Sequence, residues 1–422
     1  LLSLLLVTFS LPQLKLTMSK SSFFSGQPIF SQILNLIPRH MVFQVARDLN
    51  TDHYYKSFKT YDHLITMLYA IFNQCTSLRE VTTGLLAWEQ RIHHLGLKAH
   101  PRRSTIADAN KQRNPEAFEK IYYKLLSRYQ AVLPDSRKKS RKNNVYIFDS
   151  TTIALFQEIL KGSGMSKQDG RRKGGIKVHT LLHTVSDVPV MVRFSAGAAN
   201  DASFLKYVQL PKGSVVVFDK GFRDYRTYNR FETEQITWVT RHRDSSIYKI
   251  KERRPVNEQQ HKNGVKTDWI IELGHNHSKK ARKVQARMIH YRDPLTSKSF
   301  YFITNNLRLA PYTIAQYYRQ RWQIETFFKR IKQNFPVQYF LGDNENAIKT
   351  QIWCALIADL LLKVIRNGSK SRMSFSNTVR LVRLHLMTYM DLTSFLKAPE
   401  KSLLRKIRDQ KKQINSPPLF AT

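Results

Sequence analysis

The sequence predicts a mixed α/β fold in which helical regions precede and follow a central β-sheet. Between residues 23 and 130, apolar residues recur at the three- and four-residue spacing of amphipathic helices. From residue 145 the pattern changes to that of strands, and after Pro336 the helical spacing returns. The 422 residues are enough for two or three domains with a sizeable core.

The central region has a distinctive order of elements: strand, strand, strand, helix, strand, helix, strand. These are predicted in NVYIFDSTTI, IKVHTLL, VPVMVRF, ASFLKYV, SVVVFDKGF, RDYRTYNRFETEQ and ITWVTRH. This is the order of a ribonuclease-H-like mixed sheet. Strand-like pieces between about 244 and 300, among them DWIIEL and KVQARMIHY, predict a β-rich insertion.

The helical regions complete the domain organisation. We expect residues 18–135 to form a helical DNA-binding domain, which could be a helix-turn-helix or an ordinary helical bundle. Within RRSTIADAN, Ser104 or Thr105 is the expected N-cap of a short basic helix. The basic segment SRKKSRKNN, at 136–144, predicts a linker before a catalytic domain at 145–335 and a C-terminal helical region at 336–422.

The composition indicates a polyanionic partner. The chain has 69 Lys and Arg residues against 31 Asp and Glu residues, a formal charge of +38. Nucleic acid is the leading interpretation; ribosomal-type structural proteins and membrane-surface proteins do not usually place isolated carboxylates at strand ends. Two cysteines are too few for a disulfide framework or a Cys-based zinc site, so we expect a reducing cytoplasm.

The first 17 residues, LLSLLLVTFSLPQLKLT, resemble the apolar core of a signal peptide but lack a basic leader. We interpret them as translated upstream sequence before a start at Met18; secretion is the alternative. No other stretch approaches the roughly 20 apolar residues of a membrane span, so no membrane association is expected.

Two apolar runs each end in an acid: VYIFD at Asp149 and VVVFD at Asp219. A single aspartate at the end of a strand is usually a cap or turn residue. Two in the same context, on strands that this order of elements makes neighbours, favour a shared metal site. Hard carboxylate oxygens suit Mg²⁺, for which Mn²⁺ can substitute.

A third acid, Glu325, lies in the basic run YYRQRWQIETFFKRIKQ at 317–333. On a continuous helix, Tyr318, Arg321, Glu325 and Lys332 share an arc of about 60°, beside an apolar stripe that can pack on the sheet. The alternative is a solvated helix with Arg–Glu salt bridges four residues apart. Three acids could hold two metal ions about 4 Å apart for phosphodiester hydrolysis or strand transfer, with Arg and Lys binding phosphates.

The spacing Y-(2)-R-(3)-E-(6)-K resembles the signature of the IS-four family of insertion-sequence transposases, within the DDE superfamily. Supporting similarity comes from FDST, GGIKVH, AND, FDKGF and FITNN, and from FSQIL, SLRE and RRSTIADAN in the N-terminal region. The resemblance therefore covers nearly everything after Met18.

The resemblance implies a ribonuclease-H-like core with an insertion between the second Asp and the Glu. It implies that Asp149, Asp219 and Glu325 are the catalytic metal ligands, and that Tyr318, Arg321 and Lys332 (the other signature residues) contact the DNA backbone near the cut. The substrates would be double-stranded DNA with terminal inverted repeats and a target DNA. A homodimer would bridge two ends in the bacterial cytoplasm, at the nucleoid.

Other interpretations remain open at this stage: a nuclease of the same fold, a DNA-binding relic without activity, and a tyrosine recombinase, since Tyr317 and Tyr318 adjoin arginines. The H-N-H at 275–277 is a weak metal-nuclease signal, and the Gly-rich segment 161–175 fits no phosphate-loop template. In some members of the family that the sequence resembles, a Trp of the insertion stacks on a flipped base; Trp238 and Trp269 are the candidates here, but each is better explained as a core residue.

Overall fold

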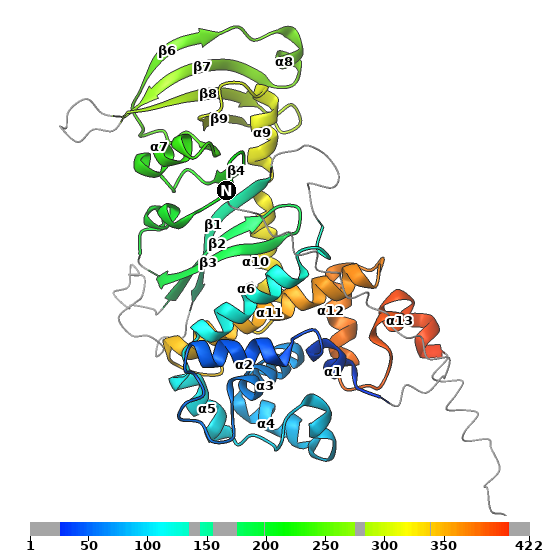
Figure 1. The fold of residues 1–422 in the computed structure, drawn as a ribbon. Helices are drawn as coiled ribbons and strands as arrows, with labels where there is room; N and C mark the ends of the chain where they lie inside the picture. The colour runs from blue at the N-terminus through cyan, green and yellow to red at the C-terminus, as the bar shows by residue number, and fades with distance from the viewer. Residues whose placement is uncertain are drawn as a thin grey trace, which may run out of the picture.

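The computed structural model describes residues 26–134, 144–154, 175–197, 199–274, 283–337 and 339–404. The predictions for the first 17 residues, for the linker except Asn144, for the Gly-rich segment except Gly175 and for the H-N-H lie outside these ranges. Within them the chain forms one mixed sheet with helices on both faces and a helical body below it (Figure 1).

The sheet has nine strands in the order β3-β2-β1-β4-β5-β9-β8-β7-β6. Strands β1, β2 and β3 are antiparallel neighbours, whereas β1, β4 and β5 run parallel. This arrangement confirms the ribonuclease-H-like prediction. Its strands are β1 (Val145–Ala154), β2 (Gly175–His183), β3 (Val188–Ala196), β4 (Val215–Phe218) and β5 (Thr237–Arg241).

The β-rich segment extends the same sheet, because β9 pairs antiparallel with β5. It contains the strands β6 (Tyr248–Arg254), β7 (Val265–Leu273), β8 (Val284–Arg292) and β9 (Ser299–Thr304), with the short helix α8 (Glu258–Lys262) between β6 and β7. Figure 1 shows these strands rising beyond the core of the sheet.

Each face of the sheet is covered by different helices. The 3₁₀ helix η3 (Asp201–Tyr207) and α7 (Tyr225–Thr233) cover one face, over a core that includes Phe148, Phe218 and Trp238. Helix α9 (Pro311–Arg319) covers the other, and α10 (Trp322–Asn334) follows it along β1.

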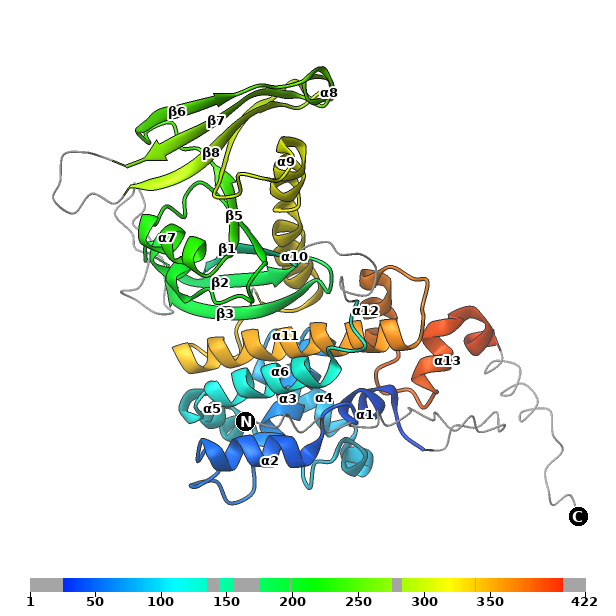
Figure 2. The ribbon, with the colours of Figure 1, turned by 45° about the horizontal axis from the view of Figure 1, so that its top comes forward.

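Helices from both ends of the chain form the helical body and share one apolar core. The 24-residue helix α11 (Glu345–Gly368) lies between the sheet and the N-terminal helices (Figure 2). The others are α1 (Ile29–Leu34), α2 (Arg39–Asp48), α3 (Thr60–Asn73), α4 (Leu78–Leu86), η1 (Glu89–Leu95), α5 (Arg103–Gln112), α6 (Glu116–Tyr129), α12 (Phe375–Leu384) and α13 (Leu392–Lys397). None of the helices in the described ranges is both long and apolar enough to cross a membrane.

Helix α6 joins this body to the edge strand β3. The hydroxyl of Tyr122 donates to the carbonyl of Pro189 at 2.8 Å, and the hydroxyl of Tyr123 accepts from the N–H of Val192 at 3.0 Å. An edge strand presents unpaired backbone groups. The two tyrosines satisfy part of that edge and hold the helical body against the sheet.

The start of α5 differs from the prediction. The helix begins at Arg103 with the extended residue Arg102 as its N-cap, and no side chain caps it, so Ser104 and Thr105 lie inside the first turn. The inner face of this helix packs against the C-terminal part of the chain. The side chain of Asn110 is buried there and donates to the Leu341 carbonyl at 3.1 Å.

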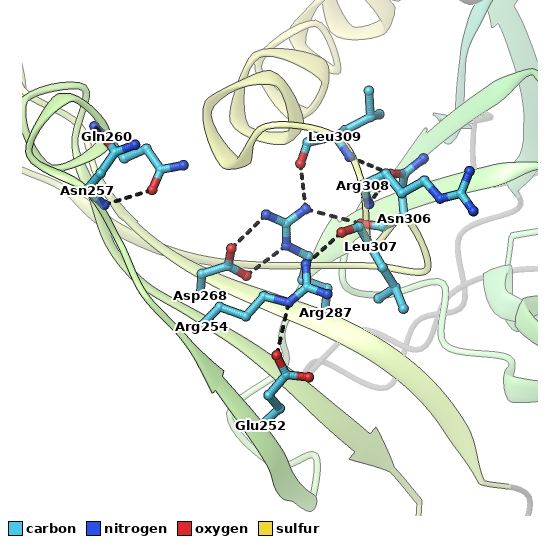
Figure 3. A network of polar contacts seen from close by, with 10 residues as sticks. All are labelled: Glu252, Arg254, Asn257, Gln260, Asp268, Arg287, Asn306, Leu307, Arg308 and Leu309. Carbon is cyan, nitrogen blue, oxygen red and sulfur yellow. Dashed lines mark hydrogen bonds and ion pairs between the residues drawn. The ribbon is translucent and has the colours of Figure 1, made fainter.

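A buried polar network connects the insertion to the turn before α9 (Figure 3). Arg287 of β8 donates to both carboxylate oxygens of Asp268, at 2.7 and 2.6 Å. The same guanidinium donates to the Leu309 carbonyl at 2.5 Å, and Asn306 accepts from the Leu309 N–H at 2.8 Å. The start of α9 is therefore fixed partly by the insertion.

Candidate active site

Strand pairing brings Asp149 and Asp219 together. Strand β4 ends at Phe218, which is the partner of Phe148 in the parallel register, so the two aspartates follow paired residues. Asp219 lies directly after its strand, as predicted. Asp149 does not end its strand, because β1 continues to Ala154 by pairing with β2 after β4 has stopped.

The predicted helix over 317–333 is two helices, not one. Helix α9 ends at Arg319 and α10 begins at Trp322. At the junction the N–H of Arg321 donates to the carbonyl of Tyr318, and the N–H of Ile324 donates to that of Arg321, which is the tighter i to i−3 spacing. One turn with 3₁₀-type hydrogen bonds therefore connects the two helices at Arg321.

Arg321 lies between two of the three acids. Its Nη2 donates to Glu325 Oε1 at 2.6 Å, and its Nη1 donates to Asp149 Oδ2 at 3.3 Å. The salt bridge four residues apart that we considered as the alternative is thus present. It is part of a larger contact, because the guanidinium also reaches the sheet.

The third acid, Asp219, is held by two donors. The hydroxyl of Tyr318 donates to Asp219 Oδ1 at 2.9 Å, and Arg241 Nη2 donates to the same oxygen at 3.1 Å. Arg241 was not among the residues predicted for the site. Its position in the sequence could have indicated it, because it is the last residue of β5, the parallel neighbour of the strand that leads to Asp219.

Lys332 lies two turns further along α10 and contacts the continuation of β1. Its Nζ donates to Thr151 Oγ1 at 3.0 Å. An open groove passes these residues, lined by Asp149, Ser150, Thr151, Glu325, Phe328, Lys329, Lys332 and Gln333. All six residues predicted for the site are thus gathered where α9, α10, β1 and the end of β4 meet.

The two aspartates differ in their proton affinity. Burial raises the pKa of Asp149 to about 6, and the carboxylates of Asp219 and Glu325 add to this, whereas the Ser150 N–H and Arg321 oppose it. Burial would also raise the pKa of Asp219, but the hydrogen bonds from Tyr318 and the Lys220 backbone outweigh it and lower the pKa. Two neighbouring carboxylates with opposite shifts are typical of a functional site.

Two further residues of the site, Tyr318 and Lys332, also have shifted pKa values. Burial raises the pKa of the Tyr318 hydroxyl well above its ordinary value, and the neighbouring Asp219 carboxylate raises it further. Partial burial lowers the pKa of Lys332. Tyr318 therefore stays protonated and serves as a hydrogen-bond donor at neutral pH.

The carboxylates of Asp149, Asp219 and Glu325 are oxygen ligands of the kind that Mg²⁺ prefers. In the described part of the chain, no three His, Cys, Asp or Glu side chains are spaced closely enough to enclose a metal ion. At this site the guanidinium of Arg321 lies between Asp149 and Glu325 and balances their charge. A metal ion there would share these carboxylates with, or take them from, Arg321.

A second ion-pair network anchors α10 to the rest of the molecule. Arg330 Nη1 lies 2.5 Å from Asp187 Oδ2, in the turn between β2 and β3, and its Nε lies 3.4 Å from Asp359 Oδ1 of α11. Lys363 of α11 contacts both acids, at 3.2 and 2.9 Å. The helix that carries Glu325 is thus held by the sheet and by the helical body.

The two tryptophans considered for base stacking lie on strands of the sheet, Trp238 on β5 and Trp269 on β7. Trp238 is fully buried and stacks on Tyr228 with ring centroids 4.4 Å apart. Trp269 is partly buried, with the guanidinium carbon of Arg253 6.0 Å from its ring centroid. The burial of Trp238 agrees with its interpretation as a core residue.

Comparison with known proteins places this geometry in a family. Residues 140–361 match the family described as the transposase DDE domain, and residues 25–98 match a domain of unknown function, DUF4372. A Sinorhizobium fredii protein named as a transposase, y4zB, is 26% identical over 303 residues, which are 71% of this chain and 81% of that protein.

Two further relatives are named as transposases of insertion sequences. That of IS5377 from Geobacillus stearothermophilus is 26% identical over 232 residues, or 54% of this chain and 59% of the relative. That of IS4SA from Synechocystis is 22% identical over 277 residues, or 62% and 71%. The structure of the piggyBac transposase synaptic complex with hairpin DNA aligns with a TM-score of 0.43 and 11% identity, over 94% of this chain and 87% of that one.

Proposed function

The chain belongs to the family of DDE transposases, enzymes that cleave DNA and transfer the strand to a new site, and we propose that Asp149, Asp219 and Glu325 are its catalytic carboxylates. One observation carries the proposal. Two adjacent residues of the signature reach all three acids: Arg321 contacts Asp149 and Glu325, and Tyr318 contacts Asp219. The signature and the two strand aspartates therefore belong to one site.

DDE transposases act with divalent metal ions, and we propose Mg²⁺ here, with Mn²⁺ as a substitute. Asp149, Asp219 and Glu325 would hold the ions. When bound, they supply activation of the attacking hydroxyl and stabilisation of the leaving oxygen. The raised pKa of Asp149, caused mainly by burial, means that its ionised form is poorly stabilised by the protein alone, so a cation beside it would be favoured.

Arg321 and Lys332 are the groups proposed to bind the scissile strand. Arg321 offers a planar fork that can hold two phosphate oxygens, and Lys332 offers a single charge further along the groove. With a metal ion held by Asp149 and Glu325, the guanidinium of Arg321 would be available to bind a phosphate. The hydrogen bond from Tyr318 would keep Asp219 oriented.

The DNA partners follow from the same activity. We propose that the enzyme binds the terminal inverted repeats of its own insertion sequence and a target duplex, and that two protomers bridge the two ends as a homodimer. The net charge of +38 supports binding to long stretches of phosphate backbone. We place the reaction in the bacterial cytoplasm at the nucleoid, where this substrate lies.

A cleavage and joining assay tests the site. Purified protein is incubated with Mg²⁺, a duplex carrying the inverted repeats that flank the reading frame, and a plasmid target. We expect wild type to cut and join, and Asp219→Asn to do neither while still binding the duplex. Asp224→Asn is the matched control, because Asp224 is also half-buried but serves to cap α7, which asparagine does equally well.

Two results would contradict the proposal. If Asp219→Asn cuts as fast as Asp224→Asn, the three carboxylates are not the catalytic set. If wild type cuts the repeats but yields no joined product under any target condition, the protein acts as a nuclease of the same fold.

A further inference from the structure

A second polar cluster lies behind the candidate active site, on the opposite face of β1. Asp149 and Thr151 contact side chains of the α9–α10 segment, whereas Ser150, between them, points to the other face. There its Oγ donates to Asp201 Oδ1 at 3.0 Å. Asp201 belongs to the AND sequence and is the first residue of η3.

Two residues of β2 surround the Asp201 carboxylate. Lys177 Nζ lies 3.1 Å from Asp201 Oδ1 and also donates to the Ala199 carbonyl at 2.9 Å. His179 is fully buried, stacks on Phe204 with ring centroids 3.8 Å apart, and has its Nδ1 3.8 Å from Asp201 Oδ1. Lys177 is therefore the cation that balances Asp201, and the carboxylate is held from two sides.

Ser150 connects this cluster to the active site through its own backbone. Its N–H donates to Asp149 Oδ1 at 2.8 Å, while its side chain donates to Asp201. A backbone N–H that holds one oxygen of a carboxylate fixes its rotation, so the other oxygen has a defined direction. In Asp149 that other oxygen, Oδ2, faces Arg321.

We propose that Asp201 is a positioning residue of the catalytic site, acting on Asp149 through Ser150. Its carboxylate holds Ser150, and the Ser150 N–H then orients the Asp149 carboxylate for the cation. This inference rests on the proposed role of Asp149. Partners of this outer kind orient the groups that bind a metal ion, and losing one typically weakens binding or activity about 10- to 100-fold.

The test uses the full-length protein and two readouts. Binding of Mn²⁺ alone is measured from the loss of the free-ion EPR signal, and the cleavage rate is measured at saturating DNA ends. The variant is Asp201→Ala, because alanine cannot accept from Ser150, whereas the amide oxygen of asparagine could. For Asp201→Ala we expect about 10-fold weaker Mn²⁺ binding and a similarly slower rate. The affinity for the DNA end should stay unchanged. Asp224→Ala, the same change at another half-buried acid on this side of the sheet, should keep the wild-type Mn²⁺ affinity.

A second variant separates positioning from folding. Ser150→Ala removes only the hydroxyl between the two acids and leaves the contacts of Asp201 with Lys177 intact. We expect it to weaken Mn²⁺ binding in the same direction. Because both changes break the same Ser150–Asp201 hydrogen bond, the double variant Ser150→Ala/Asp201→Ala should lose no more Mn²⁺ affinity than the more affected single variant does.

The outcomes are distinct. Wild-type Mn²⁺ affinity and cleavage rate in Asp201→Ala would overturn the inference, as would additive losses in the double variant. A loss in Asp201→Ala that Ser150→Ala does not share would assign Asp201 to fastening η3 alone, which also overturns it. If Asp149→Asn itself still cleaves DNA, the proposed catalytic set fails, whatever the Asp201 variants do.

Discussion

The hydroxyl of Tyr318 donates to Asp219 Oδ1 at 2.9 Å, across 99 positions of sequence. The tyrosine ring is 9% exposed and packs against Phe302 of β9, with ring centroids 5.0 Å apart. The ring is therefore fixed by the sheet core while its hydroxyl emerges at the end of β4. This single contact aligns α9 with one of the three acids.

Replacing this tyrosine with phenylalanine keeps the ring and removes the donor. We expect Tyr318→Phe to lower the free energy of unfolding at pH 7 by about 1 kcal/mol, a value reduced by solvent screening because the Asp219 side chain is 34% exposed. The Asp219 pKa is lowered in the folded state, since its hydrogen bonds outweigh burial, so this stability exists above the ordinary pKa and is lost as pH falls.

Urea denaturation measures this effect. The free energy of unfolding of Tyr318→Phe should fall below that of wild type by about 1 kcal/mol at pH 7, and by less near pH 3. Tyr312→Phe, at a 40% exposed position of the same helix, serves as the control and should change little. An equal deficit at both pH values would mean that the hydroxyl does not stabilise the ionised carboxylate.

The contribution of Asp149 to stability should have the opposite pH dependence. Burial, its main cause, raises the Asp149 pKa to about 6, so its contribution to stability is fully present below about pH 4 and is lost as pH rises through 6. Asparagine is neutral at every pH. Without divalent cations, the free energy of unfolding of Asp149→Asn should be about 2 kcal/mol higher than that of wild type at pH 7.5. The same variant should lose DNA cleavage.

Urea denaturation across pH 4 to 8 measures this difference, with Asp224→Asn as control. The advantage of Asp149→Asn should grow between about pH 4 and pH 6 and stay constant at higher pH. Adding Mn²⁺ should stabilise wild type more than the variant, because binding to the native state adds stability. A variant that is less stable than wild type above pH 6 would show that Asp149 is favourably ionised even without a cation.

The acids and the signature could be found from the sequence because they depend on local patterns. The apolar runs before Asp149 and Asp219 predicted buried neighbouring strands, and β1 and β4 are such neighbours. The apolar stripe of 317–333 predicted which side packs inward, and Ile324, Phe327 and Ile331 are buried.

The features that were predicted incorrectly from the sequence depend on long-range strand pairing and packing. Strand β1 continues beyond Asp149 because β2 pairs with it as far as Ala154, and that pairing is not visible in the polar sequence FDST. The junction between α9 and α10 has no Pro or Gly at Gln320 or Arg321 to signal it. Its two sides pack into different cores, with Ile314 on the sheet and Ile324 in the helical body.

Lys332 provides a test of DNA contact. If its charge binds a phosphate, Lys332→Ala should weaken binding to all duplexes and reduce the slope of log affinity against log salt by about 1. Titrating a labelled duplex by fluorescence anisotropy at several salt concentrations measures this. Lys120→Ala is the control, because Lys120 is a 43% exposed lysine on α6 paired with Glu116. An unchanged slope in Lys332→Ala, with the hydrogen bond to Thr151 lost, would assign the lysine to structure alone.

Removing one partner of the Arg287–Asp268 ion pair in the insertion should strongly lower the stability of the protein. Both side chains are almost fully buried, 4% and 5% exposed, so removing one leaves the other as an unpaired buried charge. Arg287→Met or Asp268→Leu alone should lower the free energy of unfolding by about 3–5 kcal/mol, whereas the double variant should recover much of it. By contrast, Glu234→Gln in the exposed pair with Arg230 should cost about 0.5 kcal/mol or less.

Urea denaturation gives these free energies, and hydrogen exchange at the Leu309 amide adds a local readout. Arg287 also donates to the Leu309 carbonyl, next to the start of α9, so Arg287→Met should raise exchange there more than Asp268→Leu does. Wild-type exchange at Leu309 in Arg287→Met would separate the insertion from the placement of α9. Faster exchange in Arg287→Met than in Asp268→Leu would mean that this arginine, 38 positions before Glu325 in the sequence, helps to set the helix that leads into the proposed catalytic residues.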